Sequence, residues 1–213
     1  SAFDSAGQRC SALRVLCLQD DVADHTLKML RGAMAECRMG NPGRLTTDIG
    51  PVIDAEAKAN IENHIQAMRA KGRPVFQAVR DNSEDAREWR SGTFVPPTLI
   101  ELASFDELKK EVFGPVLHVV RYNRNNLNEL IEQINASGYG LTLGVHTRID
   151  ETIAQVTGSA KVGNLYVNRN MVGAVVGVQP FGGEGLSGTG PKAGGPLYLY
   201  RLLANRPENA LGV

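Results

Sequence analysis

Several features that would mark other protein classes are scarce or missing in this sequence of 213 residues. Three cysteines are too few for a disulfide framework, and the odd count indicates a reducing compartment such as the cytoplasm. No apolar run reaches about 18 residues, the length that suggests a membrane-spanning helix. No basic segment followed by an apolar one opens the chain, so no signal peptide is recognisable.

Net charge is also absent, because 23 Lys and Arg residues balance 23 Asp and Glu residues. Nucleic-acid-binding domains usually carry a basic surface, so we expect no nucleic-acid partner for this segment. A neutral chain also has no electrostatic attraction to an anionic membrane. What is present is ordinary for a folded domain, with 42% hydrophobic and 22% charged residues.

Strand and helix patterns alternate along the chain. Apolar runs typical of buried strands lie at residues 13–19, 75–79, 117–122, 141–147 and 165–168. Helical periodicity is found at residues 20–39, 127–136 and 151–158, and between an N-cap at Asp54 and a stop at Gly72. The alternation predicts an α/β fold with an open, mostly parallel twisted sheet flanked by helices.

Two further segments lack such a pattern. Residues 93–102 are expected to be extended, but the Pro96-Pro97 pair argues against a central strand there. The polar segment 81–92 is expected to be a surface loop.

Glycine is concentrated near the end of the chain, where residues 173–195 hold nine of the 23 glycines. Such density predicts tight loops whose backbone lies close to another group. Residues 183–188 match the G-x-G-x-x-G spacing of dinucleotide-binding loops, but prolines on both sides leave no helix for the motif to open. We therefore do not assign phosphate binding to it.

Cysteines and histidines are the next candidates for chemistry. Cys10 follows Arg9 just before the first predicted strand, where a loop thiol can be reactive, although a buried small apolar residue fits the position equally well. Cys17 and Cys37 fall on packed faces and are predicted to be core residues. No Cys or His pair has metal-ligand spacing, so no metal site is expected, and no spacing favours a Cys–His dyad.

A carboxylate and an aromatic ring precede a rigid turn in the segment EVFGP at residues 111–115. The functional interpretation is a polar contact combined with a flat apolar face against a ring. The alternative is a plain turn before a strand, and the pattern alone favours neither.

Together these segments resemble the aldehyde dehydrogenase superfamily over nearly the whole chain. The matching segments are GQRC at 7–10, EVFGP at 111–115, GNLYVNR at 163–169 and QPFGG at 179–183. Finer details, such as Ser11 and the Gly173-Ala174 pair, resemble the branch that oxidises glutamate semialdehyde, which equilibrates with pyrroline-5-carboxylate. The sequence as a whole is most similar to the C-terminal part of bacterial bifunctional proline-utilisation flavoenzymes.

The resemblance implies NAD-dependent oxidation of L-glutamate 5-semialdehyde to L-glutamate, the second step of proline breakdown. Cys10 would be the catalytic nucleophile, which forms a thiohemiacetal and then a thioester, with its backbone N–H donating to the oxyanion. Glu111 would hold the ribose hydroxyls of the nicotinamide half of NAD, and Phe113 would pack near the nicotinamide ring.

The resemblance also implies a site for the carboxylate of the substrate. Ser11 would contribute its hydroxyl, and Gly173 and Ala174 their backbone N–H groups, because small residues let the backbone approach an anion closely. Phe181 would line the aliphatic stem of the aldehyde. These residues favour an acid-bearing aldehyde over an apolar one.

The sequence departs from the family in what is missing. The upstream lysine, oxyanion asparagine and general-base glutamate have no counterpart, nor does most of the NAD-binding domain. Since the chain also opens at Ser1 without a methionine, we expect a fragment that is inactive alone. Its catalytic domain would be residues 1–195, beginning at the nucleophile loop, and residues 196–213 would form an oligomerisation strand and a C-terminal tail.

The expected partners are a small aldehyde and further copies of the parent protein, because the apolar residues 197–203 would invite strand pairing. The parent would also carry an upstream FAD-binding domain, of which these residues show nothing. Two alternatives stay open: an aldehyde dehydrogenase for another aldehyde, and a non-catalytic assembly module of the same fold. Intact Cys10 and Glu111 speak against the second.

Overall fold

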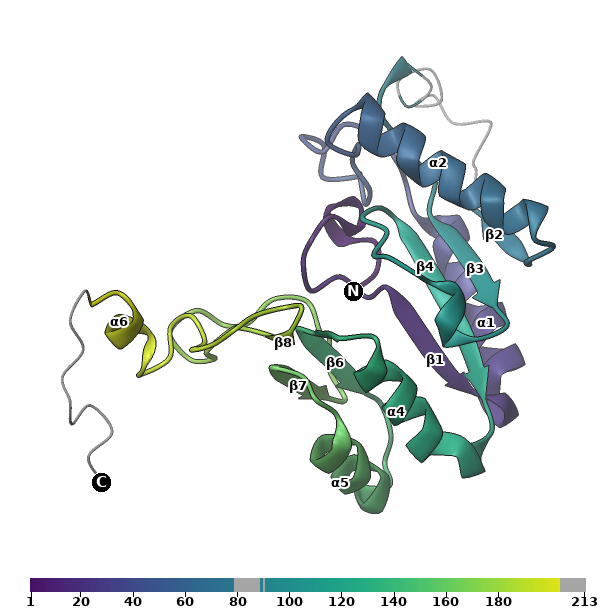
Figure 1. The fold of residues 1–213 in the computed structure, drawn as a ribbon. Helices are drawn as coiled ribbons and strands as arrows, with labels where there is room; N and C mark the ends of the chain where they lie inside the picture. Colours follow the sequence, from purple (N-terminus) through teal and green to yellow (C-terminus); the bar gives the residue numbers. More distant parts are fainter. Residues whose placement is uncertain (79–88, 90, 204–213) are drawn as a thin grey trace, which may run out of the picture. The chain divides into compact units, whose positions relative to one another are not determined.

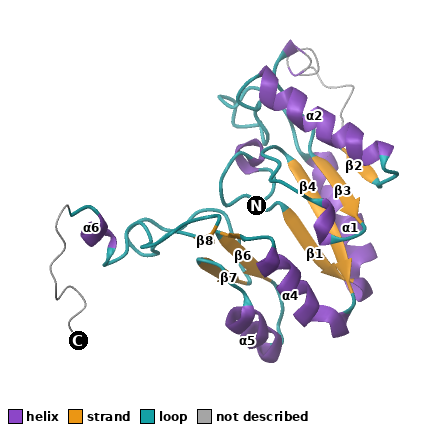
Figure 2. Cartoon of the chain, in the orientation of Figure 1, coloured by secondary structure: helices purple, strands orange, loops and turns teal. Residues whose placement is uncertain are grey.

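The computed structural model describes residues 1–78, 89 and 91–203, in two compact units, Ser1–Leu130 and Ile131–Val213. Figures 1 and 2 show the helices and strands of both units. Most of the predicted surface loop at 81–92 lies outside the described residues. The assignment of residues 1–195 to one catalytic domain stays a prediction.

The first unit is built on a four-stranded sheet with the order β1-β4-β3-β2. Its strands are β1 (Val15–Gln19), β4 (Val116–Tyr122), β3 (Thr98–Leu102) and β2 (Val75–Gln77). The pairs β1–β4 and β4–β3 are parallel, and β2 joins the edge in the antiparallel sense. The prediction of an α/β fold with a mostly parallel sheet is therefore confirmed.

The expectation that the proline pair excludes a central strand is wrong. Strand β3 lies between β4 and β2. It begins at Thr98, immediately after the prolines, so neither proline has to donate a ladder hydrogen bond. Pro97 instead contributes its carbonyl, which accepts from the backbone N–H of Ala78 at 3.0 Å.

Helices α1 (Asp20–Glu36) and α2 (Ala55–Ala70) cover opposite faces of this sheet (Figure 2). Neighbouring residues of a strand point to opposite faces, and β3 shows the consequence. Leu99 packs in one cluster with residues of α1, whereas Ile100 packs in another with residues of α2. The α1 side chains are Ala23, Leu27 and Met34, and the α2 side chains are Ile61, Ile65 and Met68.

The termini of α2 follow the sequence prediction. Asp54 Oδ1 accepts from the backbone N–H of Ala57 at 2.7 Å, which satisfies one free donor of the first turn. Gly72 follows the helix with a φ of +73°, the left-handed conformation that favours glycine at this position.

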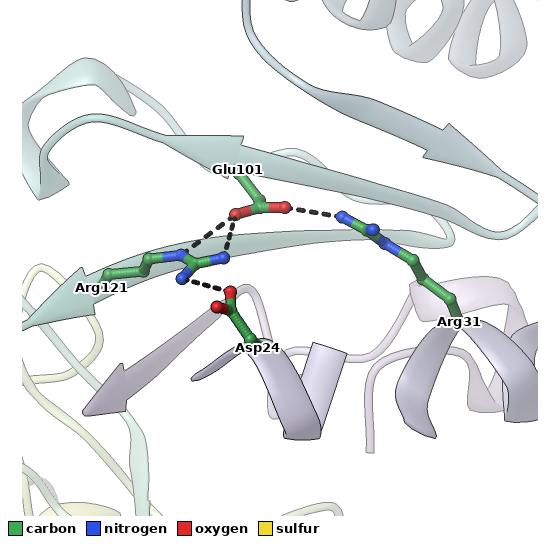
Figure 3. A network of polar contacts seen from close by, with 4 residues as sticks. All are labelled: Asp24, Arg31, Glu101 and Arg121. Atoms are coloured by element: carbon green, nitrogen blue, oxygen red, sulfur yellow. Dashed lines mark hydrogen bonds and ion pairs between the residues drawn. The ribbon is translucent and has the colours of Figure 1, made fainter. Parts of the chain in front are cut away.

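A network of charges ties α1 to β3 and β4 (Figure 3). Glu101 of β3 accepts from Arg31 of α1 at 2.7 Å and from Arg121 of β4 at 3.1 Å. Arg121 also donates to Asp24 of α1 at 2.8 Å. Since the Glu101 side chain is only 15% exposed, the two guanidinium groups compensate a carboxylate that has lost most of its water.

The second unit contains two small sheets. Strands β6 (Thr142–Val145) and β7 (Asn164–Val167) pair in parallel, with α5 (Asp150–Ser159) between them in sequence. Strands β5 (Tyr139–Gly140) and β8 (Glu184–Gly185) pair in the antiparallel sense. Helix α4 (Leu127–Ala136), predicted with these bounds, contains the division between the units.

The remaining elements are short. Three 3-10 helices lie at Asp4–Gly7, Phe105–Glu107 and Arg124–Asn126 (η1 to η3). Helix α6 (Tyr198–Arg201) is found where a strand was expected. A strand needs a neighbour to complete its hydrogen bonds, whereas this segment closes local ones, such as Leu202 N–H to Leu199 C=O at 3.0 Å.

None of the helices in the described part of the chain is long and apolar enough to cross a membrane.

Candidate active site

The predicted nucleophile lies in a turn just before β1, in which Arg9 and Cys10 are exposed while Ser11 and Ala12 are buried. The backbone N–H of Ala12 donates to the carbonyl of Arg9 at 3.1 Å and closes this turn around Cys10. The Cys10 side chain is exposed, so the alternative of a buried apolar residue is wrong. Cys17 and Cys37 pack against the core as predicted, and burial raises the pKa of Cys17 to about 12.

The loop that carries Cys10 packs against the turn at residues 111–115. Gly7 has a φ of +66°, and a Cβ added to it would overlap the carbonyl oxygen of Gly114. Only glycine permits this approach without strain. Two of the four family segments, far apart in sequence, are therefore neighbours in the first unit.

Arg14 connects the same two segments. Its guanidinium donates to the carbonyl of Gly7 through Nη1 and to the carbonyl of Arg9 through Nη2, the latter at 2.8 Å. Its Cζ lies 4.2 Å from the centroid of the Phe113 ring, within the range of a cation–π contact. No motif in the sequence singles out Arg14, although an arginine inside the apolar run predicted as a strand at residues 13–19 was a signal.

Burial and nearby charges act on Arg14 in opposite directions. Burial lowers the pKa of Arg14, while the charges of Glu111 and Cys10 raise it. Arg14 thus places a positive charge within electrostatic reach of both predicted functional residues. Glu111 is partly exposed, and Phe113 is 45% exposed.

A pair of histidines is linked to this site through the backbone carbonyl of Arg14. His118 of β4 is 1% exposed, and its Nδ1 donates to the backbone carbonyl of Arg14 at 3.1 Å. Its Nε2 is 2.8 Å from Nε2 of His64 on α2, and the rings meet edge to face. No sequence spacing predicts this pair, but a histidine among apolar residues of a central strand signalled a buried polar group that needs partners.

The implied carboxylate site falls on residues of both units. Ser11, in the first unit, is 3% exposed. In the second unit, Gly173 has a φ of +76°, and no described atom outside Gly173 and its two chain neighbours lies within 4 Å of the position that a Cβ would take. Ala174 and Phe181 are partly buried, and Phe181 exchanges two backbone hydrogen bonds of 2.9 Å with Ala193.

The other two family segments are joined within the second unit. The side chain of Asn164 donates to the carbonyl of Pro180 at 2.9 Å and accepts from the N–H of Gly182 at 3.2 Å. A Cβ on Gly163 would overlap the carbonyl of Gly182. The segments at 163–169 and 179–183 therefore form one packed loop system.

The G-x-G-x-x-G match lies in the same loop system and opens no helix. Gly185 ends β8, and Gly188 packs against the backbone of Gly183. Glycine serves close packing here, as its density predicted.

Over the described ranges, no cluster of three or more His, Cys, Asp or Glu side chains could hold a metal ion.

Comparison with known proteins gives a consistent result. Residues 1–204 match the model of the aldehyde dehydrogenase family. The bifunctional protein PutA of Escherichia coli K12 is 92% identical over 213 residues, which cover 100% of this chain and 16% of that protein. The 1-pyrroline-5-carboxylate dehydrogenase of Bacillus cereus (strain B4264) is 36% identical over 201 residues, 93% of this chain and 37% of that one.

Solved structures agree with these sequences. A crystal structure of proline utilization A from Bradyrhizobium japonicum superposes with a TM-score of 0.86 at 54% identity, over 93% of this chain and 20% of that chain. The chain thus spans only a minor part of the relatives that it matches. On the family match and these likenesses together, the chain belongs to the aldehyde dehydrogenase family.

Proposed function

We propose that these residues are the nucleophile-bearing part of an NAD-dependent aldehyde dehydrogenase that oxidises L-glutamate 5-semialdehyde to L-glutamate. The observation that carries the proposal is the exposed Cys10, on a loop packed against the segment of Glu111 and Phe113. The names of the relatives, PutA and 1-pyrroline-5-carboxylate dehydrogenase, support the substrate and a role in proline catabolism.

Cys10 performs the covalent chemistry in this proposal. Its thiolate adds to the aldehyde carbonyl and forms a thiohemiacetal, while its backbone N–H donates to the developing oxyanion. Oxidation leaves a thioester on Cys10, and water hydrolyses the thioester to the carboxylic acid. The base for that water and a second oxyanion donor are assigned to residues upstream, as in the family.

The residues around Arg14 fit the nicotinamide half of NAD. The partly exposed carboxylate of Glu111 can accept from ribose hydroxyls, and the exposed ring of Phe113 offers an apolar surface to a flat heterocycle. When bound, NAD supplies the acceptor for the hydride of the substrate. Because most of the NAD-binding domain is assigned upstream, the 213 residues alone are inactive.

Ser11, Gly173, Ala174 and Phe181 are assigned to the substrate. Gly173 has the left-handed conformation that favours glycine, with open space at its Cβ position, and the partly exposed ring of Phe181 offers a surface for an aliphatic stem.

This assignment is tested with matched aldehydes. In a longer chain that restores the upstream residues of the relatives, glutamate semialdehyde is compared with aldehydes of equal length that lack its carboxylate. We expect kcat/KM to fall by about tenfold or more without the carboxylate, since a lost charge-assisted hydrogen bond is worth roughly 1.5–3 kcal/mol. Equal values would favour another aldehyde as the substrate.

A non-catalytic assembly module of the same fold is the second candidate. It would not need a reactive thiol at residue 10, so labelling Cys10 with a thiol reagent distinguishes it from the enzyme. The remaining assignments are also proposals: cytoplasmic location, homo-oligomers of the parent, an upstream FAD-binding domain, and residues 196–213 as the oligomerisation segment and tail.

A further inference from the structure

Arg14 holds two points of the nucleophile loop at once. Its Nη groups donate to the carbonyls of Gly7 and Arg9, and the Arg9 carbonyl is the one that closes the turn around Cys10. The planar guanidinium carries its donors in a fixed fork, so one side chain sets the relative position of both carbonyls. The same plane contacts the ring of Phe113.

The backbone of Arg14 is fixed as well. Its carbonyl accepts from the backbone N–H of His118 at 3.0 Å and from Nδ1 of the same residue at 3.1 Å. Arg14 therefore connects β4 to the Cys10 turn, through its backbone carbonyl at one end and its guanidinium at the other.

One atom of this arrangement is not satisfied. Nε of Arg14 is buried and has no hydrogen-bond partner among the described residues. A buried donor without a partner costs free energy. The contacts made by the two Nη groups and the guanidinium plane are what the placement gains.

We propose that Arg14 is a positioning residue, which fixes the Cys10 turn relative to Phe113 and Glu111 and places a positive charge on the peptide group that leads into Cys10. The first task needs the shape of the guanidinium, and the second needs only its charge. A lysine would keep the charge but, as a compact ammonium on a flexible stem, would lose the fork and the stacking plane. The proposal rests on the proposed function for its kinetic readout only.

The two tasks are separated by Arg14→Lys and Arg14→Gln in the longer chain that restores the upstream residues. Arg9→Gln is the matched control, because Arg9 is also next to Cys10, is exposed, and donates through Nε to Ser5 Oγ at 3.0 Å. Two readouts are taken: kcat and KM for glutamate semialdehyde, and the rate of Cys10 alkylation by iodoacetamide, followed by peptide mass spectrometry.

We expect Arg14→Lys to lower kcat by about tenfold or more, because small misplacements of a reacting group cost this much. Its KM and its alkylation rate should stay within about twofold of the wild type, since binding and charge are kept. Arg14→Gln should lower both kcat and the alkylation rate by about tenfold. Arg9→Gln should change neither by more than about twofold.

A wild-type kcat in Arg14→Lys would overturn the positioning role. A loss of kcat in Arg9→Gln as large as that in Arg14→Gln would also overturn it, because any positive charge near Cys10 would then have the same effect. If Arg14→Gln does not fold, Arg14→Lys still decides. Failure of the proposed function can be told apart from failure of the Arg14 proposal. If the longer wild-type chain leaves the semialdehyde unoxidised, the proposed reaction is wrong. The alkylation rates, which need no turnover, then decide for Arg14 if they fall only in Arg14→Gln and against it if all variants match.

Discussion

At the scale of residues, burial has the largest effect on the pKa values of His64 and His118. The carbonyl of Arg14 can only accept, so Nδ1 of His118 carries a proton, and its Nε2 accepts from Nε2–H of His64 in the neutral form. Desolvation lowers the pKa of His118 to about 4, and the charges of His64 and Arg14 act in the same direction. Desolvation also lowers the pKa of His64, followed by the charges of Lys71 and Lys110.

These lowered pKa values predict acid sensitivity. A histidine whose pKa is lower in the folded state stabilises the fold above its unfolded pKa of about 6.5 and loses that contribution as the pH falls toward 4. We expect the free energy of unfolding to decrease between pH 6.5 and pH 4, by an amount on the order of 2–3 kcal/mol for His118.

Urea unfolding across this pH range measures the slope. His118→Asn keeps a donor for the Arg14 carbonyl but does not titrate, so its slope should be shallower than that of the wild type. His25→Asn, at an exposed position on α1, is the control and should match the wild type. A wild-type slope in His118→Asn would show that the acid sensitivity arises elsewhere.

At the scale of elements, the sequence predicted what local chemistry determines. The bounds of α4, the Asp54 cap and the Gly72 stop follow from periodicity and terminal residues, and the structure confirms them. The inner position of β3 was missed, because strand order depends on pairing between residues far apart in sequence. Helix α6 was missed because strand formation depends on a neighbour that the segment does not supply itself.

The residues of the candidate site also fall into those that local motifs identify and those that only the fold brings together. Cys10, Glu111 and Phe113 were named from motifs, and the structure brings their segments together in the first unit. Arg14 and the histidine pair were not named, because their contacts join strands and loops that no local pattern relates. The roles of Ser11, Gly173, Ala174 and Phe181 stay predictions.

The cap of α2 gives a prediction at this scale. Asp54→Ala removes the acceptor for the Ala57 N–H and should lower the free energy of unfolding by about 1 kcal/mol. Asp20→Ala is the matched control, because Asp20 opens α1 and no side-chain cap is made there at the preceding Gln19. It should cost about 0.3–1 kcal/mol, through the helix dipole alone. The urea midpoints compare the two, and a larger loss in Asp20→Ala would contradict the assignment of the cap.

At the scale of the whole molecule, the chain is a minor part of the relatives that it matches, 16% of the Escherichia coli protein. The described residues form two units, and the assigned substrate residues belong to both. The nucleophile, its loop and the predicted ribose contact lie in the first unit. The proposed function therefore predicts that turnover needs more than the residues that carry the nucleophile.

The proposed reaction depends above all on the attack of Cys10 on the aldehyde. The most direct measurement adds NAD and glutamate semialdehyde to the longer chain, as wild type and as Cys10→Ala, and follows NADH absorbance. We expect activity in the wild type, none in Cys10→Ala, and none in the 213 residues alone. Activity that survives in Cys10→Ala would make this cysteine structural and contradict the assigned mechanism. Absence of activity in both longer chains would contradict the proposed substrate and favour another aldehyde or the assembly module.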